Sequence, residues 1–140
     1  MTGNSPLILY IDDNKDNLLL VERYLAPSYR VSTAENGVDG LQEAGRSHPS
    51  LILLDIMMPG MDGYEVCSRL QEDDATSFIP VIFVTALGEE KDKARAFAVG
   101  AADYLVKPIR KPLLLEKIER HLQTTAQWSR LQEEAGPWQE

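Results

Sequence analysis

The fold is predicted most directly by the stretch Leu51-Ile52-Leu53-Leu54-Asp55. Its apolar residues follow one another without the alternation of polar and apolar residues that marks a half-exposed strand. A continuous run of this kind is typical of a parallel strand that is covered on both faces. Residues 81–84, Val-Ile-Phe-Val, have the same character. The two runs together predict a buried parallel sheet.

Short apolar or β-rich runs recur along the chain, and the intervals between them show the apolar spacing of helices. In the first interval Leu18, Val21 and Leu25 lie on one helix face, and Pro27 ends the segment. The runs span residues 7–11, 30–34, 51–54, 80–84 and 104–106. The later intervals carry the apolar stripes Val38 and Leu41; Val66, Cys67 and Leu70; Ala94, Phe97 and Ala98; and Leu115, Ile118 and Leu122.

This alternation of strand and helix predicts an α/β fold of five βα units, (βα)5. Parallel strands need long crossover connections, and right-handed crossovers in both directions cover the two faces of the sheet. We therefore expect a doubly wound five-stranded parallel sheet with helices on both faces. The run at 30–34 is the least apolar and is expected at an edge.

Composition and charge indicate one compact domain that avoids polyanions. Of the 140 residues, 44% are hydrophobic and 26% are charged, as in ordinary globular domains. The 22 acidic residues outnumber the 14 Lys and Arg, and the net charge of −8 disfavours binding to nucleic acid or anionic membranes. The longest uncharged stretch, residues 75–88, is too short to cross a bilayer. With Cys67 alone and no signal-peptide pattern at the N-terminus, we expect a cytoplasmic protein.

The C-terminal residues differ in kind from the rest of the chain. We predict a folded domain over residues 1–123 and a tail over residues 124–140, which holds both tryptophans and no strand signal. Because Trp128 and Leu131 keep helical spacing before the breaker Gly136-Pro137, the last helix is expected to continue into the tail. Two purposes stay open: a signalling helix or linker that leads to an output domain or a dimer contact, or a frayed extension.

Polar residues follow four of the five apolar runs. Asp12 and Asp13 come directly after the first run, Asp55 after the third, Thr85 after the fourth and Lys107 after the fifth. In an open α/β sheet, ligands bind beyond the carboxyl ends of the strands, so we expect these side chains to meet at one rim. Each residue alone also has an ordinary interpretation as a helix cap, a turn residue or a solvated charge.

The chemistry expected at this rim is that of a cation and a phosphoryl group. Three carboxylates repel one another unless something positive lies among them. The candidate side-chain ligands are hard oxygens, and no Cys or His has metal spacing, which favours Mg²⁺ over zinc. Lys107 would supply a second positive charge. A dianionic phosphoryl group beside a metal and a lysine is the arrangement that phosphoryl transfer needs.

These residues resemble one family, the receiver domains of two-component response regulators. The resemblance covers residues 7–123 and rests on four motifs in the family's order and spacing. They are Asp12-Asp13; residues 53–63, Leu-Leu-Asp-Ile-Met-Met-Pro-Gly-Met-Asp-Gly; Thr85-Ala86; and residues 101–108, Ala-Ala-Asp-Tyr-Leu-Val-Lys-Pro. Each motif alone is weak, whereas the four together are specific. The resemblance implies a flavodoxin-like arrangement of the sheet.

The resemblance also implies a role for each residue at the rim. Asp55 would be the nucleophile that accepts a phosphoryl group from a histidine kinase and forms an acyl phosphate. Asp13, Asp55 and the backbone carbonyl of Met57 would bind Mg²⁺ directly, and Asp12 would act through water. Lys107 would pair with the phosphate.

The same resemblance implies how phosphorylation changes the surface of the domain. Thr85 would donate its hydroxyl to a phosphate oxygen, and Tyr104 would be the aromatic switch residue that turns inward when Thr85 moves. These shifts would repack the face made by the fourth helix, the fifth strand and the fifth helix. The Lys107-Pro108 bond is expected to be cis. Met57 and Leu87 would form an apolar gate on the water that hydrolyses the acyl phosphate.

The leading function is therefore a phosphoryl-accepting signalling switch of a two-component phosphorelay, not an enzyme that acts on a separate substrate. Its expected partners are a sensor histidine kinase or a phosphotransfer protein, with an output domain or a second copy on the switch face and no direct contact with nucleic acid or membrane. A stand-alone regulator, a relay shuttle and part of a larger regulator or hybrid kinase all stay open.

Two other functions compete with this one. A Mg²⁺-dependent phosphohydrolase could work through an aspartyl-phosphate with the same acids and lysine, but 140 residues leave no room for a cap insertion. A flavodoxin-like cofactor binder would need a Gly/Ser/Thr-rich phosphate loop after the first strand, where this chain has an acidic pair instead.

Overall fold

The computed structural model describes the backbone of residues 5–135 and the side chains of residues 5–123. Strands and helices alternate throughout, and the strands form one parallel sheet in the order β2-β1-β3-β4-β5. The expected five-stranded, doubly wound sheet is confirmed, with the least apolar strand at an edge. The elements are β1 (Leu7–Ile11), α1 (Lys15–Leu25), β2 (Arg30–Ala34), α2 (Gly37–Ser47), β3 (Leu51–Leu54), α3 (Gly63–Glu72), β4 (Val81–Thr85), α4 (Glu90–Ala98), β5 (Asp103–Val106) and α5 (Lys111–Ala135).

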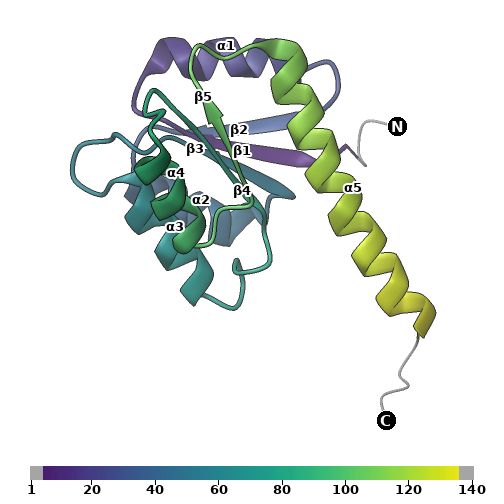
Figure 1. The fold of residues 1–140 in the computed structure, drawn as a ribbon. Helices are drawn as coiled ribbons and strands as arrows, with labels where there is room; N and C mark the ends of the chain where they lie inside the picture. The colour runs from purple at the N-terminus through teal and green to yellow at the C-terminus, as the bar shows by residue number, and fades with distance from the viewer. Residues whose placement is uncertain (1–4, 136–140) are drawn as a thin grey trace.

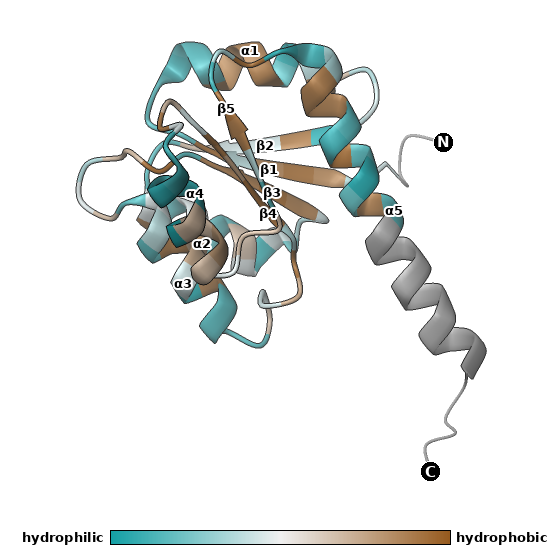
Figure 2. Ribbon diagram, viewed as in Figure 1, coloured by the Kyte–Doolittle hydropathy of each residue, from teal (hydrophilic) through white to brown (hydrophobic). Residues whose placement is uncertain are grey.

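Helices cover both faces of the sheet, with α1 and α5 on one side and α2, α3 and α4 on the other (Figure 1). Two apolar clusters correspond to these two faces. One packs Leu18 and Ile118 against the sheet, and the other packs Val66 and Leu70 against its opposite face. Every residue of β3 and β4 is buried, because these central strands are covered from both sides. Figure 2 shows the largely apolar strands between helices that carry both polar and apolar residues.

Short polar side chains cap the helices that follow β1, β2 and the β3 loop. The side-chain oxygens of Asn14, Asn36 and Asp62 each accept a hydrogen bond from a backbone N–H in the first turn of α1, α2 and α3. Asn14 is therefore the N-cap of α1. This cap begins α1 immediately after the acidic pair, which holds the pair at the carboxyl end of β1.

One of the predicted apolar stripes, Ala94, Phe97 and Ala98, was wrong, and another was half right, since Leu41 packs against the core but Val38 does not. In α2, Val38 is exposed, and Gly40 and Ala44 face the sheet instead. A Cβ on Gly40 would lie 2.5 Å from the side chain of Ile11, so this helix packs too close to β1 for larger residues. In α4, Phe97 is exposed and the buried residue is Ala96. Alanine suits either face of a helix, so the alanines around Phe97 did not identify the buried side.

The last helix continues well past Gln123, as expected, and ends at Ala135. The side chains of Trp128 and Leu131 lie outside the described residues, so the two purposes considered for the tail stay open. Among the described residues, no helix is both long and apolar enough to cross a membrane.

Candidate functional site

The acidic residues of the predicted rim lie together at the carboxyl ends of β1 and β3. These strands are parallel neighbours, with Ile11 opposite Leu54, so the residues that follow them lie side by side. One carboxylate oxygen from each of Asp12, Asp13 and Asp55 can be chosen so that all three lie within 4.8 Å of one another. Asp12 and Asp55 are buried and Asp13 is exposed. The rim predicted from the strand ends is therefore a real cluster.

Lys107 extends from the end of β5 to the two buried carboxylates. Its Nζ lies 2.9 Å from Asp12 Oδ2 and 3.2 Å from Asp55 Oδ2. The backbone N–H of Lys107 donates to the carbonyl of Thr85 at 2.8 Å, which joins the ends of β4 and β5. The peptide bond between Lys107 and Pro108 is cis, as expected from the resemblance.

The pKa shifts in the cluster follow from burial and from the sharing of one ammonium by two acids. Burial raises the pKa of Asp55, the neighbouring Asp12 carboxylate raises it further, and Lys107 offsets only part of the rise. Burial alone would also raise the pKa of Asp12, but hydrogen bonds from Tyr10 and its other donors outweigh burial and lower it. Burial would lower the pKa of Lys107, yet its contacts with both acids raise it. The site thus carries more negative charge than Lys107 alone neutralises.

Asp55 is held by the loop that follows it. Its Oδ1 accepts the backbone N–H of Ile56 at 2.7 Å and that of Met57 at 3.4 Å. Gly63, the first residue of α3, lies directly behind this loop, and its own N–H donates to the Ile56 carbonyl at 2.8 Å. A Cβ on Gly63 would lie 2.2 Å from the carbonyl oxygen of Asp55. The glycine therefore permits a close approach that the sequence analysis did not anticipate.

Thr85 and Tyr104 lie on the neighbouring strands β4 and β5, next to the acidic cluster. Thr85 is fully buried, and its hydroxyl accepts the N–H of Leu87 at 3.4 Å. Tyr104 is packed inside, with its ring centroid 6.2 Å from that of Phe83 and its hydroxyl donating to the Leu87 carbonyl at 2.7 Å. Burial raises the pKa of Tyr104 to about 12, so the hydroxyl keeps its proton at neutral pH. The Tyr104 side chain therefore lies inward, between Phe83 and the Leu87 carbonyl, and its role as a switch residue stays a prediction.

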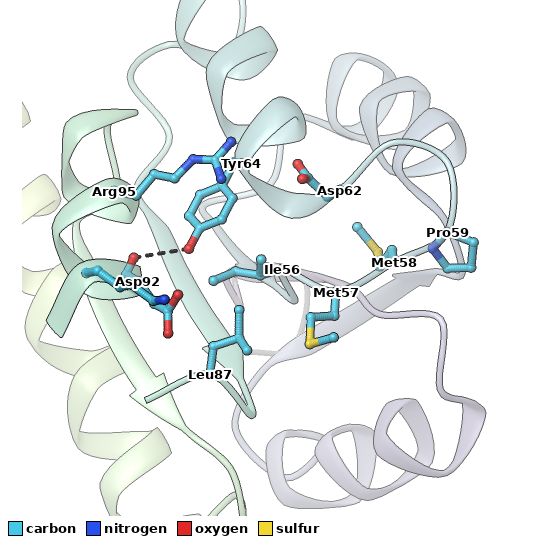
Figure 3. A pocket seen from close by; sticks show the side chains of 10 residues that line it. Ile56, Met57, Met58, Pro59, Asp62, Tyr64, Leu87, Asp92 and Arg95 are labelled. Carbon is cyan, nitrogen blue, oxygen red and sulfur yellow. Dashed lines mark hydrogen bonds between the residues drawn. The ribbon is translucent and has the colours of Figure 1, made fainter. Parts of the chain in front are cut away.

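A groove of about 760 Å³ opens beside the Asp55 loop (Figure 3). Met57 and Leu87 both border it, and the Met57 side chain is 59% exposed. At the other end of the groove, the Tyr64 hydroxyl donates to the Asp92 carbonyl at 3.2 Å, and the Arg95 guanidinium lies 4.1 Å from the Tyr64 ring centroid. The groove therefore joins the Asp55 loop to the first turns of α4.

The donors that hold Asp12 were not predicted from the sequence. Tyr10 reads as one more apolar residue of β1, yet its hydroxyl donates to Asp12 Oδ2 at 2.6 Å. Asn14 donates its backbone N–H to Oδ1 at 2.9 Å, and the Asn17 side chain lies 3.4 Å from Oδ2. Residues two apart on a strand share a face, and this spacing was the available signal for Tyr10.

The family model of the response regulator receiver domain matches residues 8–119. The chain belongs to this family. As a receiver domain it is one module of two-component signal transduction, and its flavodoxin-like fold agrees with the family's. The acidic cluster is the feature that the predicted Mg²⁺ site requires: its donors are carboxylate oxygens, which are the ligands that Mg²⁺ prefers.

Relatives and solved structures agree with this assignment. The receiver domain is 44% identical over 115 residues to the response regulator PleD of Caulobacter vibrioides, which covers 81% of this chain and 25% of PleD. It therefore spans only about a quarter of that relative. The signal receiver domain of a Luxo repressor protein from Vibrio parahaemolyticus has a TM-score of 0.85 at 29% identity and covers 91% of this chain and 98% of its own.

A third similar protein is a receiver domain whose solved structure contains magnesium. The receiver domain of the sensor histidine kinase PA1611 from Pseudomonas aeruginosa has a TM-score of 0.78 at 28% identity. The match covers 84% of this chain and 98% of that one, and the PA1611 structure holds a magnesium ion coordinated in the active site cleft.

Proposed function

We propose that this receiver domain accepts a phosphoryl group on Asp55 from a phosphohistidine of a sensor histidine kinase or a phosphotransfer protein. The observation that carries the proposal is the position of the Asp55 carboxylate. It lies beside two further carboxylates and within 3.2 Å of a lysine ammonium, and the groove beside its loop opens to solvent. An acid in this setting can react with a dianion only if positive charge is concentrated around the incoming phosphoryl group.

Asp13, Asp55 and the backbone carbonyl of Met57 are the residues proposed to bind Mg²⁺, with Asp12 acting through water. When bound, Mg²⁺ would neutralise charge on the phosphoryl oxygens. An Asp55 oxygen attacks phosphorus, the P–N bond to the donor histidine breaks, and its electron pair leaves with the imidazole. Lys107 then moves its contact from Asp55 to the new phosphate.

The output is proposed to be a change in the surface of α4, β5 and α5. The phosphate adds negative charge at Asp55, which favours the arrangement with Thr85 and Lys107 drawn toward it. Tyr104 couples this movement to the loop before α4 through its hydrogen bond to the Leu87 carbonyl. Side chains with exposed apolar area on these elements are Phe97, Val106 and Leu113. They are candidates to contact an output domain or a second copy of the receiver.

The phosphohydrolase alternative is not better supported, because the family match and the relatives are response regulators. We propose that the receiver catalyses only its own phosphorylation and dephosphorylation. The distinction is kinetic: a switch is labelled once per molecule, whereas a hydrolase releases phosphate from many substrate molecules.

Intact-mass measurement tests the proposal. The protein is incubated with Mg²⁺ and phosphoramidate, a small donor that carries the P–N bond of phosphohistidine. One phosphoryl group per chain is expected for the wild type and none for Asp55→Asn, which keeps the side-chain size. Equal labelling of the two proteins would remove Asp55 as the acceptor. Sustained multiple turnover of a simple phosphomonoester would favour the hydrolase instead.

A further inference from the structure

Tyr10 is a buried polar residue next to the acidic cluster whose hydroxyl the packing of the core does not need. It lies on β1 opposite Leu53 of β3, in the apolar cluster between the sheet and helices α1 and α5. Its side chain is fully buried. A phenylalanine would fill the same apolar space. Packing in the core therefore accounts for the ring of Tyr10 but not for its hydroxyl.

The hydroxyl is directed at Asp12, two residues further along the same face of the strand. The distance of 2.6 Å from the Tyr10 oxygen to Asp12 Oδ2 is that of a charge-assisted hydrogen bond. Lys107 also contacts Oδ2, at 2.9 Å, and the Asn17 amide lies 3.4 Å away. Three donors therefore converge on one carboxylate oxygen, which has two lone pairs.

The other oxygen of Asp12 is in a different situation. Among the described residues, the donor to Oδ1 is the backbone N–H of Asn14, at 2.9 Å. Oδ1 thus has capacity for one more donor, whereas Oδ2 is saturated. A water bound to a cation near Asp13 and Asp55 would have to use Oδ1. The donors on Oδ2 decide which edge of the Asp12 carboxylate is presented to that water.

The three donors to Asp12 Oδ2 differ in whether they keep this contact when the site changes. Lys107 is shared with Asp55 at 3.2 Å, and in the proposed phosphorylation it moves toward the phosphate. Asn17 is partly exposed on the first turn of α1 and lies at the long end of hydrogen-bond range. Tyr10 is fixed in the core and keeps its contact with Asp12 whatever Lys107 does.

We propose that Tyr10 is a positioning residue for the Mg²⁺ site: its hydroxyl fixes the Asp12 carboxylate so that Oδ1 keeps a lone pair available for a metal-bound water before and after Lys107 moves. The inference rests on the proposed function. Tyr10 would thus contribute to metal affinity, although it lies in an apolar strand of the hydrophobic core.

The test compares Tyr10→Phe with Tyr64→Phe. The control removes the hydroxyl of another buried tyrosine, which donates to a backbone carbonyl on α4 and does not contact Asp12. Isothermal titration calorimetry of Mg²⁺ into each folded protein is expected to show about tenfold weaker binding for Tyr10→Phe, the scale of losing a hydrogen bond that orients a metal-site group. Tyr64→Phe is expected to bind Mg²⁺ as the wild type does.

Phosphorylation by phosphoramidate supplies a second readout. For Tyr10→Phe, the Mg²⁺ concentration that gives half the maximal rate should rise by the same factor, while the rate at saturating Mg²⁺ stays within about twofold of wild type, because positioning is restored by mass action. A merely structural loss would lower the rate at all Mg²⁺ concentrations. Asn17→Ala is expected to shift Mg²⁺ affinity in the same direction by a smaller factor.

Unchanged Mg²⁺ affinity in Tyr10→Phe, or an equal loss in Tyr64→Phe, would overturn the inference. If Tyr10→Phe does not fold, unchanged Mg²⁺ affinity in Asn17→Ala would overturn it. The calorimetric arm contains no phosphodonor. A wild type that binds Mg²⁺ but is never phosphorylated would therefore count against the proposed function and leave the assignment of Tyr10 standing.

Discussion

Met57 and Leu87 both line the groove beside the Asp55 loop, and we propose that they face the water that would attack an acyl phosphate on Asp55. Neither has a strong hydrogen-bonding group. A water near the acyl phosphate would meet apolar surface there, and no side-chain oxygen at these positions would orient it for in-line attack. The apolar side chains at positions 57 and 87 are therefore expected to prolong the phosphorylated state, whichever residue accepts the phosphoryl group.

We predict that the phosphorylated protein loses its phosphate slowly and that Met57→Asn, Leu87→Glu together speed the loss by about tenfold or more, because a polar pair can orient the water. The autodephosphorylation rate is measured in Mg²⁺ after removal of the donor. The matched control, Met57→Leu, keeps the apolar character and should decay as the wild type does. A wild type that decays as fast as the double variant would refute the apolar gate.

Gly63 shows a second constraint at the residue scale, one of space rather than of chemistry. We predict that Gly63→Ala lowers the free energy of unfolding by about 1–3 kcal/mol, because the new Cβ would meet the Asp55 carbonyl at 2.2 Å. Gly45 of α2 is the matched control, since a Cβ there meets nothing within 4 Å. Gly45→Ala should raise stability slightly through helix propensity. Urea denaturation measures both variants, and equal effects would show that the close approach is not limiting.

At the scale of elements, a partly buried acid at the first residue of β5 joins this strand to α5. Asp103 accepts the N–H of Tyr104 at 2.8 Å, Lys117 Nζ at 3.0 Å and contacts His121 Nε2 at 2.9 Å. Burial alone would raise the pKa of Asp103, but these hydrogen bonds outweigh burial and lower it below its ordinary value of 3.8. This cluster holds the start of β5 to the middle of α5, the helix that continues to Ala135.

The lowered pKa of Asp103 determines how its contribution to stability changes with pH. Because the pKa of Asp103 is lower in the folded state, its contribution to stability is complete above pH 3.8 and is lost as pH falls through the folded-state pKa. We predict that Asp103→Asn lowers the free energy of unfolding by about 1–2 kcal/mol at pH 7 and that the difference shrinks below pH 3.8. Urea denaturation at several pH values measures it.

A surface ion pair provides the control for this experiment. Glu65 and Arg69 are both about half exposed on α3, and removing the charge with Glu65→Gln should change stability by less than about 0.5 kcal/mol. If Asp103→Asn lowers the free energy of unfolding at pH 7 no more than Glu65→Gln does, the Asp103 cluster does not hold α5 to the sheet.

The elements also show what can be predicted from sequence. Short apolar or β-rich runs predicted the five strands, and the runs of the central strands β3 and β4 are continuously apolar because both of their faces are buried. The apolar spacing failed in part for α2 and wholly for α4, where the buried faces are small residues such as Gly40 and Ala96. The acidic cluster was predictable because strand ends meet at one rim. The contact of Tyr10 was missed although its spacing from Asp12 offered a signal, and the constraint on Gly63 depends on how closely α3 packs against the Asp55 loop.

At the scale of the whole molecule, the excess negative charge at the site links cation binding to stability. Asp12, Asp13 and Asp55 have oxygens within 4.8 Å of one another, and Lys107 alone neutralises them incompletely. A cation that binds the folded chain and not the unfolded chain stabilises the fold by mass action. The domain should therefore be more stable when the site is loaded.

We predict that millimolar Mg²⁺ raises the melting temperature by about 2–5 °C. In Asp13→Ala the rise should disappear. Without Mg²⁺ the same variant should melt at or above the wild-type temperature, because one source of repulsion has been removed. Calorimetric scans with and without Mg²⁺ measure all four conditions. A rise that is the same in Asp13→Ala as in the wild type would place the stabilising cation elsewhere.

The central claim, that Asp55 rather than another acid of the cluster receives the phosphoryl group, is tested most directly by chemical trapping. Borohydride reduces an acyl phosphate to an alcohol and so converts a phosphorylated aspartate to homoserine. After phosphorylation in Mg²⁺, reduction and proteolysis, peptide mass mapping should find homoserine at position 55 and aspartate unchanged at positions 12 and 13. Homoserine at position 12 or 13, or none in a protein shown to be phosphorylated, would contradict the account.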